Sequence, residues 1–502
     1  MEKIAGTGKT IVKVVQREEA TTKVLSGRWV DTVQADGSKK SRWTTRGYEQ
    51  MLYGNENHVA GTPSLPHLKA MLVEAAAKGH AVALGDCSGA FYQAPLTEEE
   101  IFLEPPPEAG LQPEQVWKAL CAFPGLKGAP KAWEEHSARE LAKLGMDRGR
   151  YDGCLFIRIA DGVKAGRHAD DFITTGPELF VDCLLADLGD KLQLRDVVRL
   201  YNPGDEGTFL SMQVRRVEGG FTIKGKDSLI DDVLTDLGLA EAKPSVVPET
   251  KVETKQKDDD EKLNNSEQFM YRRCVGKLLQ LAPHRADIQH GIGVLSRGMS
   301  SPTKCDQRRL KKMARFLAGT RDVVLYLVPP TEKKNENEKV QIYVDADWAD
   351  KAADRRSTSG GIMYYRGCVV SSWSKRQGCV ALSTAESELY ALGAGSIEAL
   401  GFATMLSEWH ETVTPMIYSD SSSALHIVKK RGPGKMKHIE IRCLALQQWR
   451  EAKRLTFAKV HTDENPSDML TKAMTQERLA KLSLKAGLRG GPYREKTIPK
   501  NK

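Results

Sequence analysis

The feature of this sequence that most constrains its fold is a change of hydrophobic period near residue 340. In VQIYVDADW, which begins there, apolar residues alternate with polar ones, and this is the two-residue period of a strand. Two further strands around an Arg366-Gly367 turn are expected next, after which helical and strand patterns alternate. A three-strand meander continued by alternating helices and strands predicts a compact α/β domain over residues 340–475.

Four acidic residues of this predicted domain stand where a strand ends or near where a helix begins. They are Asp345, Glu388, Asp420 and Asp468. Singly, each has an ordinary structural explanation; Asp468, for example, would compensate a helix dipole. Gathered at one point, four carboxylates would repel unless divalent cations neutralised them, and hard oxygen ligands suit Mg²⁺. The order strand-Asp, helix-Glu, strand-Asp, helix-Asp therefore indicates a metal-dependent phosphodiester site.

The stretch YVDADWADKAADRRSTSGGIMYYRGCVVSSWSKRQGCVALSTAESELYAL (343–392) resembles the ribonuclease H domain of copia-type retrotransposons. It carries the Asp-Ala-Asp strand, the Asp-Arg-Arg-Ser-Thr-Ser-Gly run, the Ser-Trp-x-Ser-Lys hairpin and the Ala-Leu-Ser-x-x-Glu-x-Glu helix start of that family. KHIEIR (437–442) and DENPSDMLTK (463–472) match it too. The resemblance implies that the four acidic residues bind metal, and that His438 is a packing or hydrogen-bonding residue. For His461 it leaves open a role in product release or a plain surface position.

Two acidic sites stand out earlier in the chain. Asp86 ends the apolar run HAVALGD, and Asp170-Asp171 lie in HADDFITTG before an apolar, Thr-rich strand. Adjacent acids are weak evidence alone, because a solvated turn would carry the same pair. The surrounding sequence decides between these two interpretations.

Four stretches around these acids resemble the polymerase portion of copia-type Pol polyproteins, in the family's order. They are GRWVDTVQADGSKKSRWTTRGYEQ (fingers hairpin), ALGDCSGAFYQAPLTEEEIFLEPP, FPGLKGAPKAWEEHSARELAKLGMDRGRYDGCLF, and YRRCVGKLLQLAPHRADIQHGIGVLSRGMSSPT. The resemblance implies an α/β and α+β multidomain fold. A right-hand polymerase with fingers and palm would be followed by a helical connection and a ribonuclease H-like α/β domain.

The implied polymerase chemistry assigns roles to six residues. Asp86, Asp170 and Asp171 would hold two Mg²⁺ ions, with Mn²⁺ as an alternative, while a primer hydroxyl attacks a dNTP. Phe91 would lie below the sugar and exclude a ribose 2′-hydroxyl, or else be a core aromatic. Arg42 and Arg46 would contact the triphosphate, or else be solvated. The implied partners are an RNA template, a DNA primer, an RNA–DNA hybrid and dNTPs.

One segment departs from the family pattern of apolar residues followed by Tyr-Val-Asp-Asp. The chain has VKAGRHADD, in which Lys164, Gly166, Arg167 and His168 replace strand-forming residues, and we expect a loosened hairpin. Three hypotheses remain open. The protein has both activities; it has a working ribonuclease and an inactive polymerase; or it is a nucleic-acid binder without activity.

Composition adds modest constraints. The net charge of +8 fits a polyanionic partner, and nine scattered cysteines without a CxxC pair predict reduced intracellular thiols. The N-terminal residues lack a signal-peptide core, and an uninterrupted apolar run of about 18 residues is missing, so no membrane partner is expected. An intracellular location, in the cytoplasm or the nucleus, follows as an expectation.

Charge runs and composition give the expected domain organisation. An N-terminal extension (1–19) precedes fingers and palm (20–245), a charged linker (246–265), a helical thumb or connection (266–330), a second linker (331–339), the ribonuclease H-like domain (340–475) and a basic tail (476–502) that is expected to fray. In the helical segment, Leu310, Met313, Phe316 and Leu317 fall on one face, and Gly319 should end the helix. The basic opposite face is interpreted either as solvated or as a contact for nucleic acid.

Overall fold

The computed structural model describes residues 10–33, 37–50, 60–96, 100–250, 259–331, 339–348, 354–432 and 441–494, without the side chains of residues 441 and 442. His438, a predicted packing residue, lies outside this described part. By contacts between residues, the chain divides into two compact units, Met1–Pro63 with Ala81–Val198, and Ser64–His80 with Arg199–Lys502. The predicted fingers and palm (20–245) therefore extend over both units.

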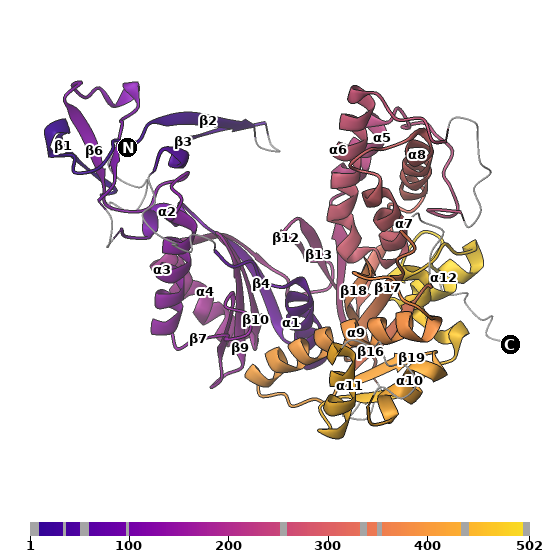
Figure 1. Cartoon of the computed structure of the whole chain (residues 1–502). Coiled ribbons are helices and arrows are strands. Elements are labelled where there is room, and N and C mark those ends of the chain that lie inside the picture. The colour runs from indigo at the N-terminus through magenta and orange to yellow at the C-terminus, as the bar shows by residue number, and fades with distance from the viewer. Residues whose placement is uncertain are drawn as a thin grey trace. The chain divides into compact units, whose positions relative to one another are not determined.

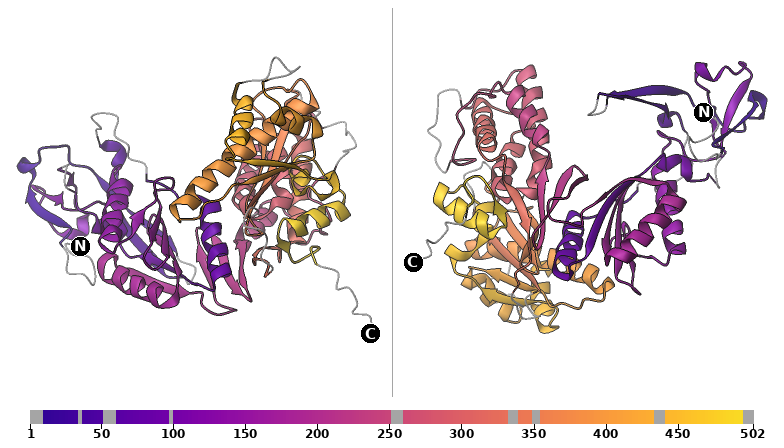
Figure 2. Two further views of the ribbon diagram at one scale, coloured as in Figure 1. Left: turned by 90° about the horizontal axis from the view of Figure 1, so that it is seen from below. Right: turned by 180° about the vertical axis from the view of Figure 1, so that it is seen from behind.

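The first unit is built on a six-stranded sheet of order β11-β4-β10-β9-β8-β7, in which the neighbours from β4 to β7 pair antiparallel (Figure 1). The strands are β4 (Ala81–Cys87), β7 (Asp147–Arg148), β8 (Leu155–Arg158), β9 (Val163–His168), β10 (Asp171–Gly176) and β11 (Leu194–Arg199). Helices α3 (Ala129–Lys143) and α4 (Glu178–Leu192) contact each other, and α4 packs on β4 and β10 (Figure 2). The apolar run of β4 is buried at successive positions, so both faces of the sheet are covered at this strand.

Smaller elements complete this unit. Strands β2 (Gly27–Val33) and β3 (Lys39–Thr45) form the predicted hairpin, and β1 (Val12–Gln16), β6 (Gln115–Ala119) and β5 (Phe102–Leu103) form a three-stranded sheet. The short helix α2 (Ala90–Gln93) follows β4.

The expectation of a loosened hairpin at VKAGRHADD is wrong. Strand β9 pairs along its length with β10 and β8. Arg167 is 2% exposed, yet its guanidinium donates to the Glu134 carbonyl at 2.7 Å and to the Ser137 hydroxyl, and it lies over the Phe156 ring. A buried guanidinium is tolerated when its hydrogen bonds are met, and here α3 meets them.

The second unit contains a five-stranded sheet of order β12-β13-β14-β15-β21 and a group of helices. The strands are β12 (Glu206–Phe209), β13 (Met212–Val217), β14 (Gly220–Gly225), β15 (Val324–Leu327) and β21 (Leu488–Arg489); the helices are α1 (Leu65–Lys78), α5 (Asp227–Asp236), α6 (Asn265–Leu281), α7 (Ala286–Arg297) and α8 (Lys304–Ala318). Helix α8 buries its predicted apolar face and ends at Gly319. The helical prediction for 266–330 is wrong at its end, because β15 pairs with β14 and β21 there.

The predicted α/β domain is present in this unit as a mixed sheet of order β18-β17-β16-β19-β20. Its strands are β16 (Val340–Ala346), β17 (Thr358–Tyr365), β18 (Cys368–Arg376), β19 (Met416–Ser419) and β20 (Thr456–Lys459); its helices are α9 (Thr384–Glu408), α10 (Ser422–Lys429) and α11 (Ile441–Glu451). Arg366 and Gly367 both have positive φ, 49° and 81°, and form the predicted turn between β17 and β18.

Helix α9 is the one described helix that is long and apolar enough to cross a membrane by length and composition. Just over half of its most apolar stretch, 56%, is buried, and it contacts β16 and β17. These are the properties of a core helix.

The expected fraying of the tail after residue 476 is wrong for its described part. Helix α12 (Gln476–Lys485) leads into β21, and Tyr493 is 2% exposed with its hydroxyl donating to Asp287 at 2.8 Å. The apolar residues of α12 supply a buried face, which the basic composition obscured.

Candidate active sites

The parallel pairing of β16 with β19 brings two of the predicted carboxylates together. Tyr343 is the partner of Tyr418 in this ladder, so Asp345 and Asp420 follow two positions later on the two chains. Parallel strands end at the same edge of a sheet, which is why residues 75 positions apart in the sequence meet there.

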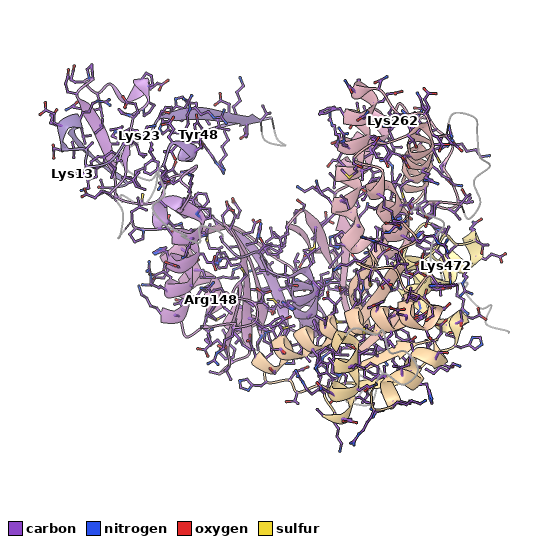
Figure 3. The ribbon with its side chains drawn as sticks, in the orientation of Figure 1. Lys13, Lys23, Tyr48, Arg148, Lys262 and Lys472 are labelled. Carbon is purple, nitrogen blue, oxygen red and sulfur yellow. The ribbon has the colours of Figure 1, made fainter. Side chains whose placement is uncertain are left out.

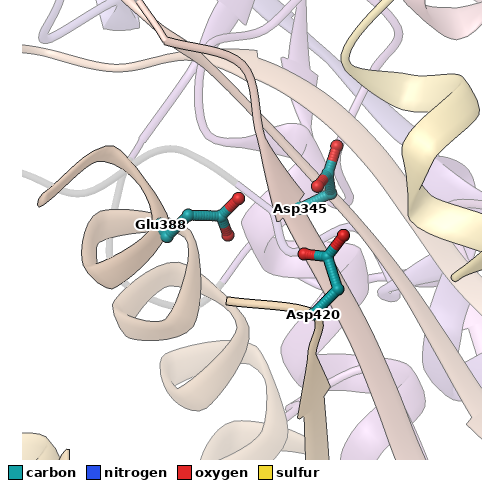
Figure 4. A group of neighbouring side chains, drawn as sticks. All are labelled: Asp345, Glu388 and Asp420. Atoms are coloured by element: carbon teal, nitrogen blue, oxygen red, sulfur yellow. The ribbon is translucent and has the colours of Figure 1, made fainter. Parts of the chain in front are cut away.

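Helix α9 adds the third carboxylate (Figure 4). Gly395 faces β16 so closely that a Cβ there would lie 2.6 Å from Cγ1 of Val344. Glu388 lies seven residues earlier, two helical turns, and therefore on the same face. Oxygen atoms of Asp345, Glu388 and Asp420 all lie within 4.8 Å of one another. In the described part of the chain, no other group of three Asp, Glu, His or Cys side chains is gathered this tightly.

The electrostatics of this group favour a cation. Burial, together with Asp345 and Asp420, raises the pKa of Glu388 to about 9, and Oε2 of Glu388 is buried without a hydrogen-bond partner. Burial raises the pKa of Asp345 to about 6, although Lys472 and a hydrogen bond from Thr471 act in the opposite direction. An orphaned buried oxygen beside two carboxylates is the expected state of a site that a divalent cation would fill.

Asp468 lies beside this group, on the short 3₁₀ helix η7 (Pro466–Leu470) and not at the start of a longer helix as predicted. Gly360 lies on β17, where it is the ladder partner of Asp345. It makes room for η7, because a Cβ at this position would lie 2.7 Å from Cβ of Leu470. The Thr471 hydroxyl then donates to Asp345 at 2.5 Å. The Asp468 carboxylate itself is held by Lys472 and Arg478, so its role as a fourth ligand stays a prediction.

The three polymerase aspartates meet at one end of the sheet in the first unit. Asp171 is the ladder partner of Asp86, and Asp170 precedes it in the β9–β10 turn. Burial, with Asp170 and Asp171 nearby, raises the pKa of Asp86 to about 6. Their oxygens are not gathered as tightly as those of the Asp345 group. The structure thus brings the three together as predicted, and their catalytic roles stay predictions.

The turn that carries Asp170 is fixed from both sides. The backbone N–H of Cys87 donates to the Asp170 carbonyl at 2.8 Å, and the buried indole of Trp133 donates to the Ala169 carbonyl at 2.6 Å. Ala169 has φ of 50°, a strained value for a residue with a Cβ. Trp133 was missed as a positioning residue, although its place in the Ala-Pro-x-Ala-Trp motif was a usable signal.

The predicted substrate-binding residues lie in the same unit. Phe91 is half-buried in α2 and therefore not a fully buried core aromatic. Arg46 lines a pocket of about 500 Å³ together with Arg28, Tyr48 and Gly125, and Tyr48 is 75% exposed (Figure 3). Arg42 does not line this pocket and stands on β3 opposite Val30.

Residues 10–251 match the family of reverse transcriptases, that is, RNA-dependent DNA polymerases. The Pol polyproteins of transposons RE1 and RE2 from Arabidopsis thaliana are 27% and 28% identical to this chain, each over 93% of its length. This chain is a homologue of copia-type Pol polyproteins. The Pol polyprotein of transposon TNT 1-94 from Nicotiana tabacum is 26% identical over 90% of the chain.

The Pol homologue spans about a third of the length of these relatives, 32% of RE1 and RE2 and 35% of TNT 1-94. Among solved structures, a foamy viral protease–reverse transcriptase in complex with an RNA/DNA hybrid aligns with a TM-score of 0.50 and 13% identity. The alignment covers 89% of this chain and 51% of the viral one. At this identity the likeness bears on the fold alone, and it confirms the predicted multidomain polymerase fold.

Proposed function

We propose that the Pol homologue is a reverse transcriptase that also cleaves the RNA strand of RNA–DNA hybrids. The observation that carries the proposal is the pairing of Asp86 with Asp171 across β4 and β10, with Asp170 in the adjoining turn, inside the segment that matches reverse transcriptases. The foamy viral relative in fold was solved with an RNA/DNA hybrid, which supports nucleic acid as the partner.

In the polymerase half, Asp86, Asp170 and Asp171 would hold the divalent cations, with Mg²⁺ proposed and Mn²⁺ as an alternative. Bound there, the cations would supply activation of the primer hydroxyl and stabilisation of the pyrophosphate charge. Burial, with Asp170 and Asp171 nearby, raises the pKa of Asp86 and so disfavours its charged form without a counter-ion, which supports cation binding at this end of the sheet. The protein's own task is to hold the three carboxylates in register through the β4–β10 ladder and the Trp133 hydrogen bond.

In the ribonuclease half, Asp345, Glu388 and Asp420 would hold the cation, with Asp468 beside them. The cation would supply an activated water and stabilise the leaving oxygen. Thr471 and the Ala346 backbone, which hydrogen-bond to Asp345 and Glu388, orient two of the three carboxylates.

Substrate contacts follow from the first unit. The Arg28–Arg46 pocket combines two guanidinium groups with an exposed phenol ring, which suits a phosphate and a base. Arg42 and Arg46 are proposed to contact the incoming triphosphate, and Phe91 to lie below its sugar.

Primer extension and hybrid cleavage, measured with Mg²⁺ on one purified sample, test the proposal. Asp86→Asn should lower extension at least about 100-fold, or about 2.7 kcal/mol of transition-state stabilisation, and leave hybrid cleavage intact. Asp345→Asn should do the reverse. Because the two aspartates lie in different units, each variant is the control for the other.

Two outcomes would overturn parts of the proposal. Hybrid cleavage without any extension by the folded parent would mean an inactive polymerase. Steeply salt-dependent binding of nucleic acid without turnover in either assay would mean a binding protein.

A further inference from the structure

Asp468 differs from the other predicted ribonuclease ligands because its charge is already balanced within the protein. Arg478 donates to Oδ2 of Asp468 from Nε at 3.0 Å and from Nη2 at 2.5 Å. Lys472 forms an ion pair with Oδ1, a buried oxygen that has no hydrogen-bond partner of its own. The Asp468 side chain is only 2% exposed, so both cations hold a carboxylate that is largely removed from water.

Lys472 reaches from this pair toward the metal group. It directly follows Thr471, whose hydroxyl donates to Asp345, so the backbone of Lys472 lies close to the carboxylate cluster. Its ammonium group interacts electrostatically with Asp345 and Asp420 as well as with Asp468. The Lys472 side chain is 47% exposed, so solvent is open to it as an alternative position.

These positions bear on how many cations the site holds. Asp345, Glu388 and Asp420 offer three oxygens to one ion, and Glu388 has an unpartnered buried oxygen for it. A second divalent ion would need Asp468 as a ligand, and there it would meet the Lys472 ammonium on the same carboxylate. Arg478 already occupies Oδ2 of Asp468 and Lys472 occupies Oδ1, so a second ion must displace one of them, and Lys472, 47% exposed against 29% for Arg478, is the one we expect to move.

We propose that, in the absence of nucleic acid, Lys472 takes the place of a second divalent cation in the ribonuclease site and is held there by Asp468. The site then binds one divalent cation until Lys472 moves into solvent, and Asp468 is a positioning residue in that state. The inference rests on the proposed ribonuclease function and specifies how its metal site is loaded.

A titration of the full chain with Mn²⁺ tests this inference. Electron paramagnetic resonance measures the binding, because the signal of free Mn²⁺ is lost when the ion binds. Asp86→Asn, Asp170→Asn and Asp171→Asn are introduced in every sample, so that the polymerase site contributes no binding. We expect one equivalent of Mn²⁺ for this parent, and a second equivalent for Lys472→Met with an affinity at least about 10-fold higher than any second binding to the parent. Lys472→Arg keeps the charge and should stay at one equivalent.

Two further variants make the outcomes distinct. Lys481→Met removes another partly exposed lysine of the same region, which pairs with Glu464, and should also stay at one equivalent. Glu388→Gln should remove the first equivalent. Mn²⁺ binding that is unchanged by Glu388→Gln would overturn the proposed metal site itself. Binding that is lost in Glu388→Gln, but has the same stoichiometry in the parent and in Lys472→Met, would overturn only the role of Lys472.

Folding of each variant is checked by thermal melting in EDTA, and Lys472→Gln replaces Lys472→Met if the latter does not melt cooperatively. Two Mn²⁺ equivalents bound by the parent with similar affinity would also overturn the inference.

Discussion

At the residue scale, Glu388 is a carboxyl group whose charge the metal-free fold disfavours. Its pKa of about 9, raised by burial and by Asp345 and Asp420, lies above the usual value near 4.5. The folded state therefore binds a proton between these values that the unfolded state does not, so the stability of metal-free protein should fall as pH rises from about 4.5 to about 9.

Glu388→Gln should remove this dependence. In EDTA at pH 8 we expect the variant to be more stable than the parent by about 1–3 kcal/mol, and at pH 4 the difference should vanish. Thermal or urea melting at both pH values measures it, with Glu398→Gln on the same helix as the control. If the difference in stability between the variant and the parent is the same at pH 8 and at pH 4, burial does not disfavour the charged form of Glu388.

Phe91 makes a second prediction at this scale. Phe91→Val removes the ring that is proposed to lie below the sugar, and if this ring excludes a ribose 2′-hydroxyl, the ratio of rNTP to dNTP incorporation should rise at least about 10-fold. Single-nucleotide extension measures this ratio. Tyr92→Phe is the control, because the Tyr92 ring packs against Phe123 instead. An equal loss of incorporation for both nucleotides would instead mark Phe91 as a packing residue.

At the element scale, the distance between α9 and β16 sets the position of Glu388. Gly395→Ala would place a methyl group 2.6 Å from Val344 and push the helix outward, whereas Gly393 has open space around it. We expect Gly395→Ala to lower hybrid cleavage at least about 10-fold with primer extension unchanged. Gly393→Ala should keep cleavage and raise stability by up to about 1 kcal/mol, because it removes only backbone freedom. Equal behaviour of the two variants would contradict this role of Gly395.

The strand and helix order of the ribonuclease-like domain could be predicted, because period, turn residues and caps are local signals. The Arg366-Gly367 turn and the Ser383 cap, which accepts from the Glu386 N–H, are examples. The capping box is incomplete, since the Glu386 carboxylate accepts from the Leu382 N–H instead. Strand β15 was predicted as helix because its short apolar run carries no period of its own, and its place depends on β14 and β21.

The site could be predicted in its carboxylates but not in their surroundings. A carboxylate at a strand end is visible in sequence, whereas the partners of Arg167 on α3 and of Asp468 on α12 lie in other elements. Lys164 and Arg167 therefore suggested a weakened strand, since a cation in a strand signals exposure unless its buried partners are known. The need for glycine at Gly360 and Gly395 could not be predicted either, because it depends on which atoms of other elements lie against these two residues.

At the scale of the whole molecule, the second unit is built from two separate segments of the chain. Helix α1 clusters with this unit although the chain on both of its sides belongs to the first. It contacts β14, β15, β18 and α9, and its buried Lys69 donates to the Pro283 carbonyl at 2.7 Å. The unit thus needs a segment that is encoded more than a hundred positions before its main part.

We therefore predict that residues 199–502 alone do not form a stable unit. Leu68, Met71, Leu72 and Val73 of α1 are at most 1% exposed, and their burial contributes on the order of 6–12 kcal/mol as an upper bound. This is comparable to the whole stability of a domain, about 5–15 kcal/mol. The fragment should melt without a cooperative transition, and fusion of residues 64–80 through a flexible linker should restore one, together with Mg²⁺-dependent hybrid cleavage. The matched control carries Leu68→Asp and Leu72→Asp in the fused segment and should behave like the bare fragment. A bare fragment that melts as cooperatively, and at the same temperature, as the fusion would show that α1 is not required.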